Sequence, residues 1–239
     1  MWSRAALRGA LTYHIQSSDF RDSIGKGGHL TGRGHALSAT MNGPGVDSWG
    51  GGVCPYNAGW RKVMMWWFIV TDGLLFAGFL ASYGYARVLG GNWPDLSQVF
   101  SLPFIAAMTF VLISSSATMA GAVDAARRSN WPQVLRFVAA TALGGLVFLG
   151  MQAYEWMHVI QNGARLDANP WGDRAFGAYF FLLTGFHGSH VLTGIVVLLA
   201  TAARSAGRRS SADGVEMAGL YWHFVDLVWV FIFTLFYLL

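Results

Sequence analysis

Six ionisable side chains stand out within long apolar stretches of the sequence. Asp72 belongs to the first stretch, Glu155 to the third, His187 and His190 to the fourth, and His223 and Asp226 to the fifth. An ionisable group inside a bilayer costs about 2.5–3.5 kcal/mol on insertion scales, so such a group faces protein or water and usually has a function. Any chemistry of this chain should therefore depend on these six residues.

The histidines and one acid are spaced for a shared helix face. His187 with His190, and His223 with Asp226, are three residues apart, which places each pair about 60° apart around a helix. One interpretation is a metal or haem site, because two facing helices would then supply three imidazoles and a carboxylate. The other is polar packing between helices. The glycines within the GFHGSH segment permit close helix contact, and they favour packing.

Asp72 has two interpretations of its own. An acid at membrane depth can relay protons, or it can accept hydrogen bonds from hydroxyls such as that of Thr71 and from a neighbouring helix. The sequence leaves both open. The hydroxyl-rich run at 114–118 is typical of a helix-packing face. The bulky stripe Trp222, Val225, Trp229 and Phe236 is expected to face lipid or a partner protein.

Five apolar stretches must position these residues. The chain is 54% hydrophobic and only 12% charged, where a soluble domain carries roughly 25% charged residues. A hydrocarbon core of about 30 Å needs some 20 helical residues. The stretches 63–87, 104–124, 134–159, 176–203 and 217–239 qualify. They lack the alternation of a membrane β-barrel. The predicted fold is an all-α integral membrane bundle of five transmembrane helices.

Charge predicts the orientation of this bundle. Cytoplasmic loops carry an excess of Lys and Arg. Counted over five spans, one side holds Arg4, Arg8, Arg21, Lys26, Arg33, Arg61, Lys62, Arg127, Arg128, Arg136, Arg204, Arg208 and Arg209; the other holds Arg87, Arg165 and Arg174. The N-terminus is therefore expected inside and the C-terminus outside. The scattered basic residues do not suggest a nucleic-acid partner.

The chain divides by composition into two parts. Residues 1–62 form a Gly-rich polar tail, expected on the cytoplasmic side with irregular structure, and residues 63–239 form the five-helix domain. The tail is expected either to contact a partner subunit or to be disordered, and its basic residues would also suit the anionic inner leaflet. Its single cysteine, Cys54, excludes an internal disulfide.

Four segments together carry a family resemblance. FLLTGFHGSHVLTG (Phe181 to Gly194), YWHFVDLVWVF (Tyr221 to Phe231), WWFIVTDGLLFAGFLASY (from Trp66) and MQAYEW (around Glu155) resemble, in the same order, subunit III of the haem–copper terminal oxidases. The family includes subunits of cytochrome c oxidases and quinol oxidases. The resemblance covers about 63–239, and it is to the short form with five spans.

The resemblance implies an accessory subunit without catalytic residues or a metal of its own. Haem and copper would lie in subunits I and II, and this chain would pack on subunit I in a hetero-oligomeric complex of the respiratory chain. It would support electron transport to oxygen, proton uptake and translocation, and the stability of subunit I, and would hold phospholipid, in a bacterial inner (plasma) membrane. Asp72, Glu155, His187, His190, His223 and Asp226 would then be intramembrane polar packing or proton-related residues.

The sequence departs from the family pattern at two places. Longer members have two further spans where this chain has its tail, and the commoner Ser-Glu pair reads Thr71-Asp72 here. The alternatives left open are a subunit III-like component of a quinol oxidase, a nitric oxide reductase or a respiratory supercomplex. Two further alternatives belong to other classes of protein. One is a stand-alone membrane metalloprotein that uses His187, His190 and His223, and the other is a transporter.

Overall fold

The described part of the chain is entirely helical. The computed structural model describes residues 60–91, 93–166, 169–207 and 210–239, and no strand occurs among them. The expected N-terminal tail, with Cys54, lies outside these residues except for 60–62, which belong to the first helix, and Arg208 and Arg209 lie outside them too. The elements are α3 Trp60–Leu89, α4 Leu96–Val99, α5 Leu102–Arg127, α6 Trp131–Gln161, α7 Arg174–Ala206, α8 Ala212–Ile232 and a π-helix Phe233–Leu238.

Five of the described helices are long and apolar enough to cross a membrane. The expectation of five apolar helices in a membrane bundle is therefore confirmed. Helices α3, α5, α6 and α7 extend a few residues beyond the predicted spans at both ends, whereas α8 begins five residues before its span and gives way to the π-helix after Ile232. Polar caps mark the start of three helices. Asn130, Asp173 and Ser211 each accept a hydrogen bond from a backbone N–H in the first turn of α6, α7 and α8.

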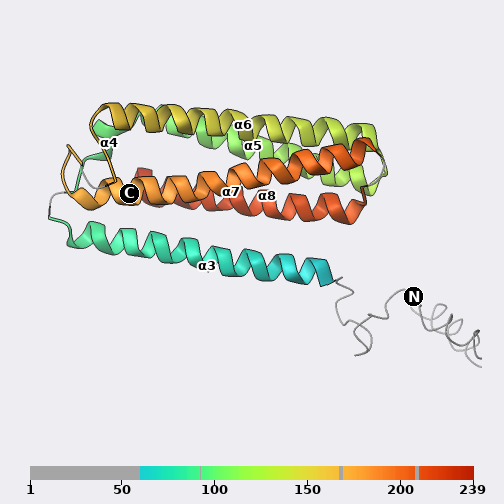
Figure 1. The fold of residues 1–239 in the computed structure, drawn as a ribbon, viewed down its shortest axis with the longest axis horizontal. Helices are drawn as coiled ribbons and strands as arrows, with labels where there is room; N and C mark the ends of the chain where they lie inside the picture. Colours follow the sequence, from blue (N-terminus) through green and yellow to red (C-terminus); the bar gives the residue numbers. More distant parts are fainter. Residues whose placement is uncertain (1–59, 92, 167–168, 208–209) are drawn as a thin grey trace, which may run out of the picture. The chain divides into compact units, whose positions relative to one another are not determined.

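Helices α5, α6, α7 and α8 form a four-helix bundle, against which α3 packs (Figure 1). Each of the four contacts its neighbour in the chain, and α8 returns to contact α5; α3 contacts α8 and α7. The helices differ in how far they are buried. In the most apolar part of α3 only 6% of the residues are buried, whereas in the most apolar part of the segment that begins with α8 the share is 56%. Helix α8 is thus the centre of the fold and α3 its periphery.

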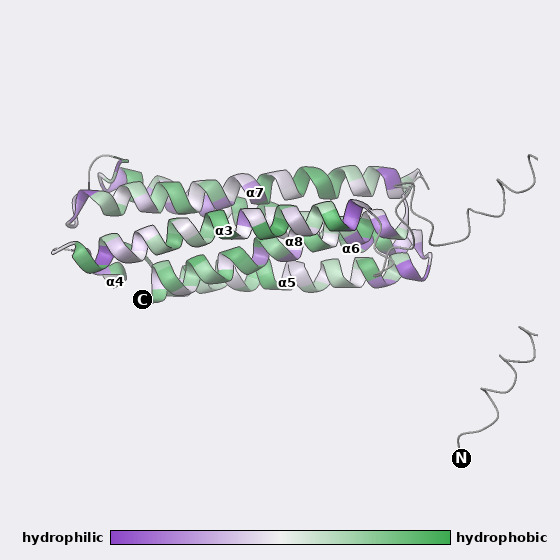
Figure 2. Ribbon diagram, turned by 90° about the horizontal axis from the view of Figure 1, so that it is seen from below, coloured by the Kyte–Doolittle hydropathy of each residue, from purple (hydrophilic) through white to green (hydrophobic). Residues whose placement is uncertain are grey.

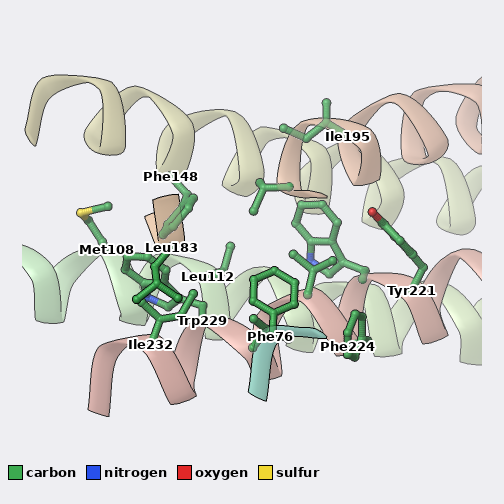
Figure 3. Packing of buried hydrophobic residues seen from close by; sticks show 14 of the residues in the cluster. Phe76, Met108, Leu112, Phe148, Leu183, Ile195, Tyr221, Phe224, Trp229 and Ile232 are labelled. Atoms are coloured by element: carbon green, nitrogen blue, oxygen red, sulfur yellow. The ribbon is translucent and has the colours of Figure 1, made fainter. Parts of the chain in front are cut away.

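Aromatic side chains of α8 fill the interior of the bundle (Figure 3). Trp222 and Trp229 are fully buried, as are Val225 and Phe236. The prediction that this stripe faces lipid or a partner is wrong. The reason is that α8 contacts α3, α5 and α7 at once, so a helix that is apolar on every face is enclosed by protein.

Glycines give Trp222 its space. A Cβ added at Gly145 of α6 would lie 2.5 Å from the Trp222 ring, and one at Gly194 of α7 would lie 2.9 Å from it. Its indole N–H donates to Ser115 Oγ of α5 at 3.1 Å. Trp222 therefore joins three helices to its own, and a small residue is required at both glycine positions.

Hydrophilic residues gather towards the ends of the bundle (Figure 2). Because consecutive long helices run in opposite directions, α3 and α8 begin, and α5 ends, at one end, here called the Lys62 end. There Lys62 Nζ lies 3.1 Å from Glu216 of α8, which also lies 3.9 Å from Arg127 of α5. The opposite end, here called the Arg87 end, holds the C-terminus of α6.

Candidate functional site

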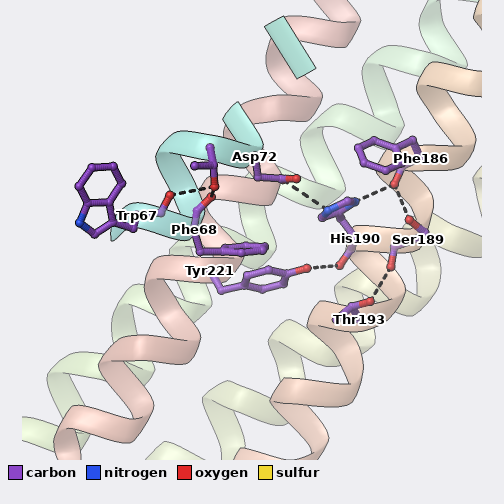
Figure 4. A network of polar contacts seen from close by, with 9 residues as sticks. Trp67, Phe68, Asp72, Phe186, Ser189, His190, Thr193 and Tyr221 are labelled. Carbon is purple, nitrogen blue, oxygen red and sulfur yellow. Dashed lines mark hydrogen bonds and ion pairs between the residues drawn. The ribbon is translucent and has the colours of Figure 1, made fainter. Parts of the chain in front are cut away.

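An acid and an imidazole meet between α3 and α7 (Figure 4). His190 Nε2 lies 3.4 Å from Asp72 Oδ2, and both side chains are largely buried. The other ring nitrogen, Nδ1, lies 2.9 Å from the carbonyl oxygen of Phe186, one turn earlier in α7. This contact requires a proton on Nδ1, and the ring is then held with Nε2 directed at the carboxylate.

A tyrosine of α8 completes this network. Tyr221 donates its hydroxyl proton to the carbonyl oxygen of His190 at 3.1 Å. Thr71, next to the acid, donates instead to carbonyl oxygens of its own helix, at Trp67 and Phe68. The expected Thr71-like donor is therefore not the partner of Asp72, and the network joins α3, α7 and α8 through His190 and Tyr221.

His187 occupies a different environment from His190. It is fully buried, and its ring contacts those of Phe148 (centroids 5.7 Å apart) and Trp229 (5.1 Å), which also contact each other. Neither ring nitrogen has a hydrogen-bond partner among the described residues. The two histidines of α7 thus share a helix face in the broad sense, but His187 points into the aromatic core and His190 towards α3.

His223 and Asp226 lie at the contact of α8 with α5. His223 Nδ1 is 2.6 Å from Ser116 Oγ, within the hydroxyl-rich run of α5. Asp226 is buried, and neither carboxylate oxygen has a hydrogen-bond partner among the described residues. The run at 114–118 is therefore a helix-packing face, as expected, since Ser115 and Thr118 also bond across to α8 and α6.

Glu155 lies near the Arg87 end of α6. Tyr237, in the π-helix, donates to Glu155 Oε2 at 3.1 Å, and Gln152 Nε2 lies 3.4 Å from the same oxygen. The other oxygen, Oε1, has no partner among the described residues. Sequence patterns did not identify Tyr237, Tyr221 or Ser116 as partners, because Tyr237 meets Glu155, Tyr221 meets the His190 carbonyl oxygen and Ser116 meets the His223 ring across helices distant in the chain.

The six residues do not converge on one point. They divide into an Asp72–His190 pair, an enclosed His187, a His223–Asp226 group beside Ser116, and a Glu155–Tyr237 pair. Among the described residues no three or more His, Cys, Asp and Glu side chains are placed to hold a metal ion. The arrangement is that of separate polar contacts between helices.

Five apolar helices with acids and imidazoles buried at helix–helix contacts define a multi-pass helical membrane protein. A family model described as cytochrome c oxidase subunit III matches residues 54–239. The chain belongs to this family.

Curated relatives agree with this assignment. The chain is 35% identical to cytochrome c oxidase subunit 3 of Corynebacterium diphtheriae over 71% of its own length and 83% of that protein. It is 34% identical to the subunit 3 of Alkalihalophilus pseudofirmus, over 73% and 84%. It is also 32% identical to a probable quinol oxidase subunit 3 of Staphylococcus saprophyticus, over 75% and 89%. The chain is thus subunit III of a haem–copper oxidase, a component of a hetero-oligomeric membrane complex.

Proposed function

We propose that this chain is the accessory subunit III of an aerobic cytochrome c oxidase, and that it packs on the catalytic subunit I. Haem and copper would be held by subunits I and II, where oxygen is reduced. The observation that carries this proposal is the separation of the buried acids and imidazoles into contacts between helices of the chain itself, with Asp72 facing His190 at 3.4 Å. Such groups hold a scaffold together and need no cofactor among them.

The largely exposed helix α3 supports a scaffold role. Most of its residues face away from the bundle, so it offers an apolar surface at membrane depth to lipid or to a neighbouring subunit. An apolar groove of about 490 Å³ runs between α3 and α8, with Gly73, Ala77 and Phe224 in its walls. We place bound phospholipid, or a neighbouring subunit, against this surface.

The chain is also proposed to support proton uptake by subunit I and its durability during turnover. Asp72 and Glu155 are buried acids with partners on other helices, His190 and Tyr237, and they are the residues through which such support would act. We further propose a bacterial plasma membrane location with the N-terminus inside, because basic residues are concentrated at the Lys62 end.

Removing the chain tests this function. An oxidase purified without it should retain its haem absorption spectrum and initial oxygen consumption. It should lose activity faster during turnover, and its proton pumping per electron should fall. The readouts are an optical spectrum, an oxygen-electrode trace and proton release from vesicles. Loss of a haem signal together with this chain would contradict the proposal.

A second candidate follows from the Staphylococcus saprophyticus relative, whose name is that of a quinol oxidase subunit. In that case the chain would have the same scaffold role beside a catalytic subunit that oxidises quinol. Nitric oxide reductase and supercomplex assemblies are further proposals of the same kind. The subunits that co-purify in mild detergent distinguish them, since each assembly has its own electron-donor components.

A further inference from the structure

A pocket at the Arg87 end combines a buried carboxylate with aromatic rings. It has a volume of about 240 Å³ and lies between the segment joining α4 to α5 and the last turns of α6. Its walls are Val99, Phe100, Ser101, Phe104, Tyr154, Glu155 and His158. Of these residues, only Glu155 has a part in the proposed function.

Glu155 supplies the polar group of the pocket. Its side chain is only 5% exposed. Tyr237 and Gln152 both lie at Oε2, on the side of the bundle interior. Oε1 is left without a partner although the residue lines the pocket. A buried carboxylate oxygen without a donor is unfavourable, so a ligand that carries N–H or positive charge would be stabilised beside it.

Aromatic rings make up much of the remaining wall. The rings of Phe104 and Tyr154 have centroids 5.6 Å apart, and Phe100 lies at the end of the segment that leads into α5. The faces of such rings carry negative electrostatic potential and attract cations, and organic ammonium groups are recognised in this way. A carboxylate with three rings therefore selects an organic cation over an anion or a neutral apolar group.

The volume of the pocket and its position along α6 restrict the kind of ligand that it can bind. A water molecule takes roughly 30 Å³ of liquid volume, so the pocket is large enough for a small organic group. Glu155 lies six residues before the end of α6, which is roughly 9 Å along the axis. This depth is close to the level at which lipid headgroups meet the end of a membrane helix.

We propose that this pocket binds an organic ammonium group, as carried by the headgroup of an aminophospholipid. The ammonium lies beside the Glu155 carboxylate and packs against the rings of Phe104 and Tyr154. The hydroxyl of Ser101, which makes no capping hydrogen bond to α5, and the exposed imidazole of His158 are left to contact the polar remainder of the headgroup.

Lipid retention tests the proposal directly. The oxidase complex containing the full chain is placed in nanodiscs of mixed phosphatidylethanolamine and phosphatidylglycerol, released into detergent, and the retained lipids are counted by native mass spectrometry. The wild-type complex should retain phosphatidylethanolamine in preference to phosphatidylglycerol. Glu155→Gln, which keeps an acceptor for Tyr237, should lower that retention about tenfold, since a charge-assisted bond is lost.

Matched variants separate the site from general effects on folding. Phe104→Leu should weaken retention roughly threefold to tenfold through loss of a cation–π contact. Phe110→Leu removes a ring from the same helix at a position that is 73% exposed, and it should change nothing. If the complex with Glu155→Gln does not assemble, the comparison of lipid retention between Phe104→Leu and Phe110→Leu still tests the proposal. Equal retention in these two variants, or unchanged retention in a folded Glu155→Gln complex, would overturn the proposal.

Soluble probes distinguish the source of the ammonium. Choline should displace the retained lipid, whereas its neutral isostere 3,3-dimethyl-1-butanol should not. Binding of choline that depends on Glu155, without lipid enrichment, would support the site with a soluble amine as its ligand. Displacement by both compounds, or a zero-length carbodiimide cross-link from Glu155 to a lysine of a neighbouring subunit with no amine retained, would overturn it.

Discussion

At the scale of single residues, the buried acids and imidazoles are distinguished by their partners. Asp72 has His190 opposite it across a helix contact, and His190 is oriented by its own helix. Glu155 is bonded through one oxygen, its other oxygen has no hydrogen-bond partner among the described residues, and the residue lines a pocket. His187 has aromatic rings as neighbours. The same residue types thus have different roles because different helices meet them.

The Asp72–His190 pair should show measurable coupling. Polar pairs between membrane helices average about 0.6 kcal/mol and reach about 1.7 kcal/mol. We expect Asp72→Asn and His190→Gln each to lower the unfolding free energy, and the double variant to lose less than the sum by about 0.5–1.5 kcal/mol. The unfolding free energies of the wild type, the two single variants and the double variant are measured by reversible unfolding in mixed micelles. Strictly additive losses would show that the two side chains do not interact.

The sequence predicted which residues matter at this scale better than it predicted their partners. Spacing indicated that His187 and His190 share a face, but two residues about 60° apart can meet different helices. His190 meets α3 and His187 meets α6 and α8. The partners Tyr237 and Ser116 are 82 and 107 residues away from the groups they contact. Only the packing of the helices brings such residues together.

At the scale of elements, the close contact of α6, α7 and α8 depends on two glycines. Gly145 and Gly194 leave the space that Trp222 fills, and in each case the nearest ring atom would be within 3 Å of an added Cβ. Such a distance is shorter than any normal contact, so either the ring or a helix must move. Small residues at helix contacts allow this kind of close approach in membranes.

Replacing these glycines should therefore destabilise the bundle. Gly145→Ala should lower the unfolding free energy by roughly 1–3 kcal/mol, as overpacking does. Trp222→Phe in the same chain should restore part of the loss, because the smaller ring makes room. Gly150→Ala, with nothing within 4 Å of the added Cβ, is the control and should be neutral or slightly stabilising. Equal effects at 145 and 150 would refute the contact.

The positions of the helices could be predicted from hydropathy, but which side chains of a helix are buried could not. Four of the predicted spans each lie within a long helix, and the fifth, 217–239, runs through most of α8 and the π-helix that follows it, since some 20 apolar residues in a row have few other structures. The outward position expected for Trp222 and Trp229 was wrong because lipid and protein interiors are equally apolar. A helix such as α8 therefore looks the same in sequence whether it is central or peripheral.

At the scale of the whole molecule, basic residues are distributed unevenly between the two ends of the bundle. Described basic residues concentrate at the Lys62 end, where Lys62 and Arg127 both lie near Glu216. Fewer are present at the Arg87 end. From the positive-inside rule we propose that the Lys62 end faces the cytoplasm.

The single cysteine allows a direct check of this orientation. Cys54 precedes α3 in the sequence, on the side expected to be cytoplasmic. A membrane-impermeant maleimide should label it in inverted vesicles and not in intact cells. A detergent-solubilised sample, which should be labelled in either case, is the control. Labelling of intact cells would reverse the proposed topology.

The enclosure of His187 gives the protein an internal chemical reporter. A water-borne acylating reagent such as diethyl pyrocarbonate needs direct access to an imidazole nitrogen, and both nitrogens of this one are buried in the core beside the Phe148 and Trp229 rings. Carbethoxylation at position 187 would thus require separation of α6 from α8. Its rate under native conditions would follow the frequency with which the helices part, while His158 near the surface would react regardless.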